Sequence, residues 1–161
     1  MPNAINAISW NCRGLGNPLT VEALQKVVLE KDPTLVFLME TKMDTMEMDG
    51  IKRKVERKQG LVVPSIKRAS GLALLWKTSM QVDVLTYSLQ HINAIVTEEQ
   101  GRKKWRFIGF YGHLETRKRE ESWNLLESLN LRSDLPWICM EDYKEIMHAK
   151  EKEGGGVRPN G

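Results

Sequence analysis

Four polar side chains lie in, or at the ends of, four separate apolar segments of the sequence. They are Asn11, Glu40, Tyr111 and Asp142. If neighbouring strands deliver an amide, a phenol and two carboxylates to one place, the resulting cleft suits a hard cation, which prefers oxygen ligands. The same cleft suits a phosphate group. The sequence therefore indicates one site for a metal ion and a phosphate.

Three of these residues also have ordinary structural interpretations. Glu40 would mark the exit of a strand to solvent, and taken alone it fits that interpretation better. Asn11 would bond into the turn over residues 14–17, and Tyr111 would be a core aromatic with its hydroxyl at the rim. The functional interpretation rests on the residues together.

The fourth residue, Asp142, follows the apolar segment 137–140. Its carboxylate could position or deprotonate an attacking water molecule. Two further acids, Glu141 and Glu145, flank it, so the spacing does not determine which carboxylate acts. The structural alternative is an aspartate that begins a turn.

Length and composition bound the class of protein. The 161 residues fit one domain, and 41% hydrophobic with 28% charged residues is an ordinary globular balance. No apolar segment is long enough to span a membrane, and the first residues do not read as a signal peptide. Cys12 and Cys139 both lie in apolar segments, which favours buried, reduced thiols and an intracellular setting. A monomer is assumed. No Cys/His spacing suggests zinc.

The net charge of +3 is unevenly distributed. Basic residues gather at 52–58 and again at 102–106, which favours a polyanionic partner. The alternative is that these are solvated hairpin tips and helix faces. We expect nucleic-acid contacts from Arg102, Lys103, Lys104 and Arg106.

Hydrophobic periodicity predicts the elements that position these residues. A strand is expected at 5–12, a helix at about 21–31 with Thr20 as N-cap, and a strand buried on both faces at 34–39. The further expected elements are a helix within 42–60, strands at 61–66, 71–77, 81–87, 91–98 and 104–111, a helix at 118–129 and a strand at 137–141. This order implies a mixed sheet with helices packed outside.

Five segments together resemble a known family. They are Ser-Trp-Asn-Cys-Arg-Gly-Leu-Gly-Asn-Pro, Phe-Leu-Met-Glu-Thr-Lys, Ser-Gly-Leu-Ala-Leu-Leu-Trp-Lys, Gly-Phe-Tyr-Gly-His and Leu-Pro-Trp-Ile-Cys-Met-Glu-Asp. In order and spacing they are similar to the endonuclease/exonuclease/phosphatase superfamily. Within it they most resemble the endonuclease domain of plant LINE-type (non-LTR) retrotransposons.

The resemblance implies a single α/β domain over residues 1–161, a four-layer sandwich of the deoxyribonuclease I-like type. It implies hydrolysis of DNA phosphodiesters that depends on Mg²⁺ or Mn²⁺. Glu40 would bind the metal, and Asn11 would belong to the network around metal and phosphate. Tyr111 would contact the scissile phosphate, and Asp142 would align or activate the water. A DNA substrate would imply nuclear residence.

Two departures from the family predict weak or no activity. Relatives usually read Gly-Asp-Phe-Asn where this chain has residues 141–144, and Lys144 shares a side with Asp142 on an extended segment. A cation about 5 Å from another unit charge costs roughly 3 kcal/mol at an effective dielectric of ~20. The family's C-terminal portion, which ends in a Ser-Asp-His motif, is also absent, so we expect a degenerate or truncated retroelement copy. The alternatives are an inactive nucleic-acid-binding module and a fragment that folds poorly alone.

Overall fold

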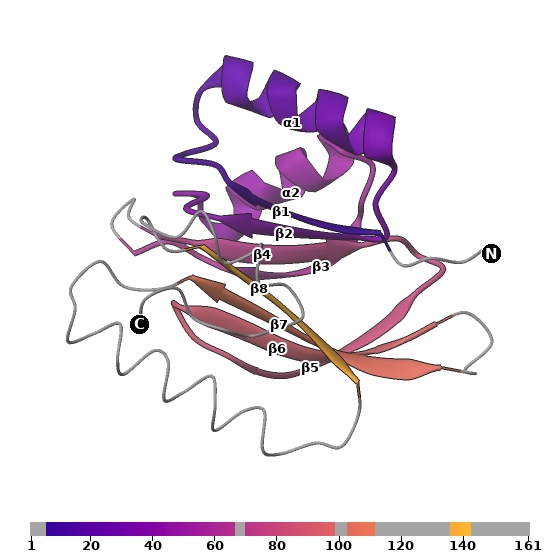
Figure 1. The fold of residues 1–161 in the computed structure, drawn as a ribbon. Coiled ribbons are helices and arrows are strands. Elements are labelled where there is room, and N and C mark those ends of the chain that lie inside the picture. The colour runs from indigo at the N-terminus through magenta and orange to yellow at the C-terminus, as the bar shows by residue number, and fades with distance from the viewer. Residues whose placement is uncertain (1–5, 67–69, 99–102, 112–135, 143–161) are drawn as a thin grey trace, which may run out of the picture.

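A computed structural model describes residues 6–66, 70–98, 103–111 and 136–142 of the chain. In this part, eight strands form two four-stranded sheets. Two helices lie on one side of the first sheet, and the second sheet lies on its other side (Figure 1). The described part therefore stacks a helical layer, a sheet and a second sheet.

The first sheet holds the N-terminal half of the described chain. Its order is β1-β2-β4-β3, with strands β1 (Ala7–Asn11), β2 (Leu35–Met39), β3 (Gln59–Val63) and β4 (Leu72–Trp76). β1 runs parallel to β2, which sets Asn11 opposite Met39. The other two pairings are antiparallel. A parallel pair needs a crossover, and the first helix supplies it.

The helices are α1 (Pro18–Lys31) and α2 (Thr45–Lys54). The expected N-cap of α1 at Thr20 is wrong, because the Asn17 side chain accepts a hydrogen bond from the Leu19 amide and the helix begins at Pro18. Proline suits a first helical position because its missing N–H has no partner there. α2 begins with a reciprocal capping box between Asp44 and Glu47.

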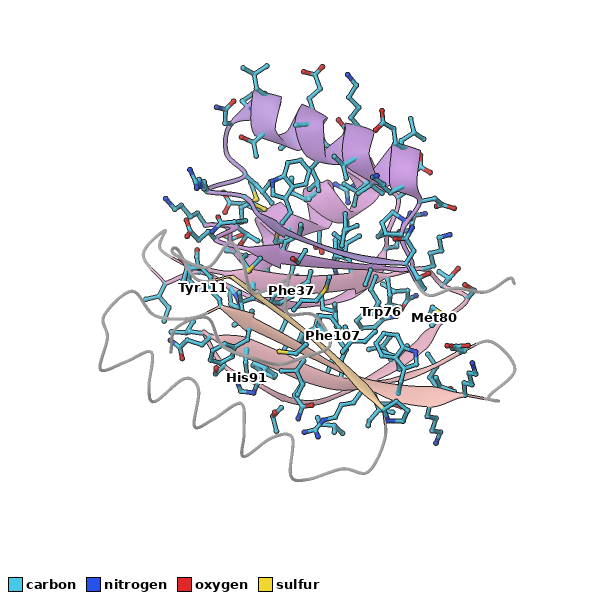
Figure 2. All side chains as sticks on the ribbon, viewed as in Figure 1. Phe37, Trp76, Met80, His91, Phe107 and Tyr111 are labelled. Atoms are coloured by element: carbon cyan, nitrogen blue, oxygen red, sulfur yellow. The ribbon has the colours of Figure 1, made fainter. Side chains whose placement is uncertain are left out.

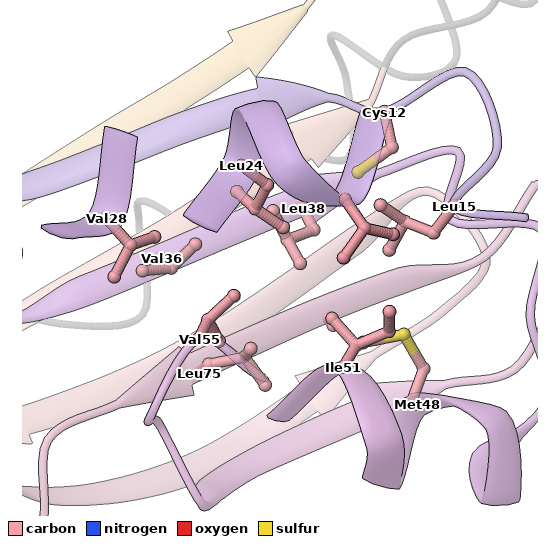
Figure 3. Packing of buried hydrophobic residues seen from close by; sticks show 12 residues of the cluster. Cys12, Leu15, Leu24, Val28, Val36, Leu38, Met48, Ile51, Val55 and Leu75 are labelled. Atoms are coloured by element: carbon pink, nitrogen blue, oxygen red, sulfur yellow. The ribbon is translucent and has the colours of Figure 1, made fainter. Parts of the chain in front are cut away.

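The face of the first sheet that carries the helices forms one hydrophobic core. Figure 3 shows side chains of both helices meeting those of β2 and β4. The residues at its centre include Leu24, Val28, Val36, Leu38, Ile51 and Leu75. β2 is 0–2% exposed along its whole length, which confirms the expectation of a strand buried on both faces.

The second sheet has the order β5-β6-β7-β8. Its strands are β5 (Gln81–Tyr87), β6 (His91–Thr97), β7 (Lys104–Tyr111) and β8 (Trp137–Asp142). The bounds of β5 and β7 are those expected from the sequence. β7 and β8 are parallel, and the other two pairs are antiparallel. This parallel pairing sets Tyr111 opposite Asp142.

The two sheets pack face to face through a second core. The Phe37 and Phe107 rings, one from each sheet, meet edge to face with centroids 5.7 Å apart (Figure 2). Gly109 makes this approach possible, since a Cβ there would lie 2.6 Å from the Phe37 ring. This contact packs β2 of the first sheet against β7 of the second.

The expected fold class, an α/β arrangement of mixed, mostly antiparallel sheets with helices outside, is confirmed. The helix expected at 118–129 lies outside the described residues, as does Lys144. No helix within the described ranges is long and apolar enough to cross a membrane.

Candidate active site

Three of the four residues singled out in the sequence meet at one point between the sheets. Asn11 ends β1, Glu40 follows β2 directly, and Tyr111 ends β7. The Asn11 amide Nδ2 donates to Glu40 Oε2 at 3.1 Å, and the Tyr111 hydroxyl donates to the same oxygen. Figure 2 shows Tyr111 at the end of the second sheet that lies nearest the first. Glu40 therefore joins side chains from both sheets.

Both ends of the Asn11 side-chain amide have partners. Its Oδ1 accepts a hydrogen bond at 3.0 Å from the amide of Arg13, the residue before the expected turn at 14–17. Its Nδ2 is directed to Glu40. The turn fixes the amide, and the fixed amide orients the carboxylate.

Tyr111 combines a core position with a polar contact. Its ring packs against the second core and its hydroxyl reaches Glu40. A phenol has one proton to donate. A hydrogen bond from Tyr111 to a phosphate oxygen therefore requires that the proton turn away from Glu40.

For Asp142 the structure describes the backbone alone. The register of β8 on β7 places its Cα opposite that of Tyr111. The position of its side chain lies outside what the structure describes.

The pKa of the Glu40 carboxyl is held below its ordinary value. Partial burial acts to raise this pKa, but the hydrogen bonds from Tyr111 and Asn11 outweigh it, with help from the positive charges of Lys42 and Arg13. The carboxylate is therefore ionised at neutral pH and available to a cation.

The backbone around Glu40 is strained. Arg13, Glu40, Lys42 and Ser70 all have left-handed φ angles between 52° and 63°. Left-handed geometry costs a non-glycine residue roughly 1–2 kcal/mol, and such strain clusters at functional sites.

Hydrogen bonds between three loops hold this geometry. The Gly14 amide bonds the Glu40 carbonyl at 2.8 Å, and the Lys42 amide bonds the Ser70 carbonyl at 2.9 Å. Gly71 is required beside them, because its φ is +101° and a Cβ there would lie 3.1 Å from the Lys42 nitrogen. These three loops form the rim of the site, and their hydrogen bonds set the backbone conformation of the rim without a ligand.

The donor set fits one hard cation held by a single carboxylate. Within the described ranges no three His, Cys, Asp or Glu side chains come together. Mg²⁺ is nevertheless often held by one or two carboxylates, with waters and substrate phosphates completing its shell. Both hydrogen bonds to Glu40 fall on Oε2, and none from a described residue reaches Oε1.

An open groove of about 670 Å³ adjoins this rim. It runs between β1, at the edge of the first sheet, and the start of α1. The side chains that line it include Trp10, Asn11, Arg13, Asn17 and Thr20.

The sequence analysis missed two cations at the rim, Arg13 and Lys42. Each lies two residues after a residue that the analysis singled out, Asn11 and Glu40 respectively. Their place in the same two motifs was the available signal.

Arg106, at which we expected a nucleic-acid contact, is buried in this structure. Arg106 is 1% exposed, and its Nε donates to Asn93 Oδ1 at 2.9 Å. It lies on β7, the strand between β6 and β8. Lys103 and Lys104 are exposed, whereas Arg102 lies outside the described residues.

The other basic cluster, at 52–58, also contains a buried member. Arg57 is 6% exposed, so its charge does not face a partner. The exposed pair, Lys103 and Lys104, lies at the far end of β7 from Tyr111, roughly 23 Å away at about 3.3 Å per residue.

Neither cysteine forms a disulfide. Burial, together with the nearby charge of Glu40, raises the pKa of the Cys12 thiol to about 12. Cys12 is therefore an unreactive core thiol, as expected, while Cys139 is only partly buried.

Several solved structures share the fold of this chain. An endonuclease/exonuclease/phosphatase family protein from Bacteroides thetaiotaomicron has a TM-score of 0.67 at 13% identity, over 88% of this chain and 64% of its own. The human Nocturnin catalytic domain with bound sulfate has a TM-score of 0.64 at 13% identity, over 96% and 77%. D. rerio TDP2 complexed with a single-strand DNA product has a TM-score of 0.61 at 18% identity, over 98% and 66%.

At these identities the structures establish the fold alone. The chain spans 64% and 65% of the lengths of the two Bacteroides thetaiotaomicron proteins that it matches. No curated protein sequence matches the chain significantly. Residues 8–140, however, match a family by sequence, and this range contains Asn11, Glu40 and Tyr111. The chain belongs to the Endonuclease/Exonuclease/phosphatase family.

Proposed function

We propose that this domain hydrolyses DNA phosphodiesters slowly in the presence of Mg²⁺ or Mn²⁺. The observation that carries the proposal is the convergence of Asn11 and Tyr111 on one ionised carboxylate, Glu40, at the ends of strands from two sheets. A fixed carboxylate with one oxygen turned away from its donors suits a metal ion that also binds a phosphate.

Each residue has a defined task in this proposal. Glu40 would hold the cation, which when bound stabilises negative charge on the phosphate and on the leaving oxygen. Asn11 and Tyr111 keep the carboxylate in one orientation. When substrate arrives, the Tyr111 hydroxyl can turn from Glu40 and donate its one hydrogen bond to a phosphate oxygen instead. Asp142, whose backbone lies opposite Tyr111, would align or deprotonate the attacking water.

DNA is proposed as the substrate for two reasons. The five motifs are similar to the endonuclease domain of plant LINE-type retrotransposons, and the solved TDP2 structure of the same fold holds single-strand DNA product. A domain of this origin would act in the nucleus. Slow turnover is proposed because Lys144 replaces the asparagine usual in relatives.

A plasmid-nicking assay tests the proposal. We expect weak conversion of supercoiled plasmid to the open circle with Mg²⁺ or Mn²⁺, none with a chelator, and none for Glu40→Gln, which removes the charge and keeps the shape. Glu30→Gln, an equal change at an exposed position on α1, should leave nicking unchanged.

The alternative is a catalytically inactive module that binds nucleic acid. It would be favoured if the folded protein binds DNA in a salt-dependent manner but shows no nicking with either ion. Nicking that persists in Glu40→Gln would contradict the proposed site, because the activity would then come from elsewhere.

A further inference from the structure

A histidine lies buried on the second sheet, apart from the residues that meet at Glu40. His91 begins β6 and is 5% exposed. Its neighbour Ile92 faces the core between the sheets, so the His91 ring points to the opposite side of the strand. Figure 2 shows it on the side of the second sheet that faces away from the first. Neither printed hydrogen bond to Glu40 comes from this ring, so any effect on the site is indirect.

Both ring nitrogens of His91 have hydroxyl partners. Nδ1 lies 2.7 Å from the Ser88 Oγ, and Nε2 lies 2.9 Å from the Thr86 Oγ1. Burial lowers the pKa of the imidazole, so the ring is neutral at neutral pH, with one nitrogen that donates and one that accepts. A hydroxyl can do either, so both bonds form with either tautomer. The ring is therefore fixed from two sides.

The hydrogen bonds on the Thr86 side of the ring continue across the sheet. Asn93 Nδ2 donates to the Thr86 Oγ1 at 3.2 Å, and Arg106 Nε donates to the Asn93 Oδ1 at 2.9 Å. These bonds link β5, β6 and β7. Hydrogen bonds are stronger in a buried network than in water, so this network holds the His91 ring in place.

On its other side the ring supports the turn between β5 and β6, residues 88–90. The Ser88 amide donates to the His91 carbonyl at 2.9 Å, and the Ser88 Oγ accepts from the Gln90 amide at 3.0 Å. Two-residue hairpin loops favour a backbone with positive φ, and neither Leu89 nor Gln90 has one. The turn therefore lacks the most favourable backbone geometry and depends more on its side-chain hydrogen bonds.

This turn holds Tyr111 at the end of β7. The Tyr111 amide donates to the Gln90 carbonyl at 2.7 Å. The bond lies beyond the last pair of the β6–β7 ladder, His91 with Phe110. Strand ends open more readily than strand centres, and on the other side of β7 the partner of Tyr111 is Asp142, itself the last residue of β8. The position of Tyr111 therefore depends on how firmly the turn holds Gln90.

We propose that His91 is a positioning residue of the candidate active site, which acts through Tyr111. Its ring fixes the turn at 88–90 through Ser88. The turn holds the end of β7, from which the Tyr111 hydroxyl reaches Glu40. The inference rests on the proposed function, since it adds support behind the same carboxylate. The ring itself would touch neither substrate nor metal.

The test is hydrogen exchange of the Tyr111 amide, followed by NMR in deuterated water without a divalent ion. The variants are His91→Gln, His91→Asn and Ser88→Ala. A glutamine amide reaches the place of Nε2 and can keep the bond to Thr86, whereas an asparagine amide lies near the place of Nδ1 and can keep the bond to Ser88. Ser88→Ala removes the bond to the turn and leaves the histidine in place.

Three further measurements separate positioning from a general loss of stability. Ser79→Ala is the matched control, because Ser79 is exposed and lies just before β5, at the opposite end of that strand from Ser88. The Leu38 amide, in the first sheet, reports on the stability of the whole fold. The ring Cζ signal of Tyr111, in protein with labelled tyrosine, reports on the hydrogen bond of its hydroxyl.

We expect the Tyr111 amide to exchange roughly fivefold faster in His91→Gln and Ser88→Ala, about the factor that one hydrogen bond contributes. In both variants the Cζ signal should move toward that of an exposed tyrosine, while exchange at Leu38 stays unchanged. His91→Asn and Ser79→Ala should match the unaltered protein. Unchanged exchange at Tyr111, equal acceleration at Tyr111 and Leu38, or recovery by glutamine rather than asparagine would overturn the inference.

Failure of this inference is distinguishable from failure of the proposed function, because exchange and the Cζ signal need no activity. If both respond as expected and the unaltered protein never nicks plasmid, the role of His91 stands and the hydrolase proposal fails. If Glu40→Gln abolishes nicking while Ser88→Ala and His91→Gln leave the Tyr111 amide unchanged, the hydrolase proposal stands and the role of His91 is refuted.

Discussion

Glu40 receives hydrogen bonds from residues that belong to different sheets, since Asn11 ends β1 and Tyr111 ends β7. A carboxylate held from two sides cannot rotate to meet a ligand, so its orientation is set by the fold. At the residue scale, the pKa of the Glu40 carboxyl therefore indicates whether these hydrogen bonds are formed.

Replacement of Tyr111 by phenylalanine should raise the pKa of Glu40, because it removes a hydrogen bond to the charged form. Carbon-detected NMR of the side-chain carboxyl over a pH series measures this. Tyr87→Phe, at an exposed tyrosine, should leave the Glu40 pKa unchanged.

The same substitution has a consequence for stability against pH. The folded-state pKa of Glu40 lies below the unfolded value of about 4.3, so its contribution is present above that pH. The contribution is lost as pH falls through the folded-state pKa. Tyr111→Phe should thus lose stability near neutral pH and show a smaller difference from the unaltered protein in strong acid, by urea unfolding.

Replacement of Lys144 by asparagine should increase nicking roughly tenfold, which is about half of the ~3 kcal/mol that a nearby unit charge can cost. Single-turnover nicking rates measure the effect. Lys31→Asn, the same change at an exposed lysine, serves as the charge control. An unchanged rate in Lys144→Asn would mean that the lysine does not impede the reaction.

Sequence reasoning at this scale found Asn11, Glu40 and Tyr111, because each breaks an apolar pattern. It missed Arg13 because an arginine in a turn is ordinary in sequence, and only the distance to Glu40 gives it meaning. It did not predict the burial of Arg106, because the burial of a strand residue depends on the rest of the fold, which the local pattern does not specify.

At the scale of elements, Arg57 ties the end of α2 to the start of β2. Its guanidinium donates to the Pro33 carbonyl at 2.8 and 3.2 Å, to the Glu56 carbonyl at 3.0 Å and to Asp32 at 3.1 Å. The buried guanidinium supplies hydrogen-bond donors to the backbone carbonyls of Pro33 and Glu56. It is structural, although its sequence neighbourhood suggested a polyanion contact.

Arg57→Met should lower the free energy of unfolding by roughly 2–4 kcal/mol, because it leaves buried acceptors without donors. Lys77→Met removes the other cation bound to Asp32, at 2.8 Å, and should cost less than about 1 kcal/mol because that pair is exposed. Urea denaturation measures both. If both variants lose the same free energy of unfolding, the buried hydrogen bonds of Arg57 do not stabilise the fold as described.

Hydrophobic periodicity predicted which segments are helices and which are strands. It did not predict the first residue of α1. The pattern placed the first helix near 21, yet α1 begins at Pro18 because Asn17 caps it. A proline preceded by asparagine is also a turn signal, and local sequence does not decide between turn and cap. The strands were easier to predict because the runs at 81–87 and 104–111 have clear ends.

At the scale of the whole molecule, the site exists because the two sheets pack closely. Gly109 allows the Phe37 ring to lie against β7, which brings the end of that strand toward the first sheet. Gly109→Ala should destabilise the protein by about 1–3 kcal/mol through overpacking, and should weaken Mg²⁺ binding as the sheets separate. Thermal unfolding and metal titration measure the two effects.

Two further variants test whether the clash with Phe37 causes the loss of stability in Gly109→Ala. Gly16→Ala adds a methyl group where nothing lies within 4 Å, so it should be nearly neutral. Phe37→Leu combined with Gly109→Ala should recover part of the lost stability, because the smaller side chain leaves room for the methyl group. If the double variant is no more stable than Gly109→Ala, the clash is not the cause.

The fold class could be predicted from the order of strands and helices, and the family motifs pointed to the same architecture. The way in which the sheets face one another could not. Asn11 and Tyr111 are a hundred residues apart in sequence, and their meeting depends on the parallel pairing of β1 with β2 and on the packing of Phe37. Local periodicity carries no information about either.

The most direct test of the assembled metal site is a Mg²⁺ titration of the isotopically labelled protein, followed by amide NMR, alongside Glu40→Gln. The account predicts saturable shifts concentrated at Asn11–Gly14, Glu40–Lys42 and Tyr111, and their loss in Glu40→Gln. Shifts that are absent, or that survive unchanged in Glu40→Gln, would contradict a metal site built on that carboxylate.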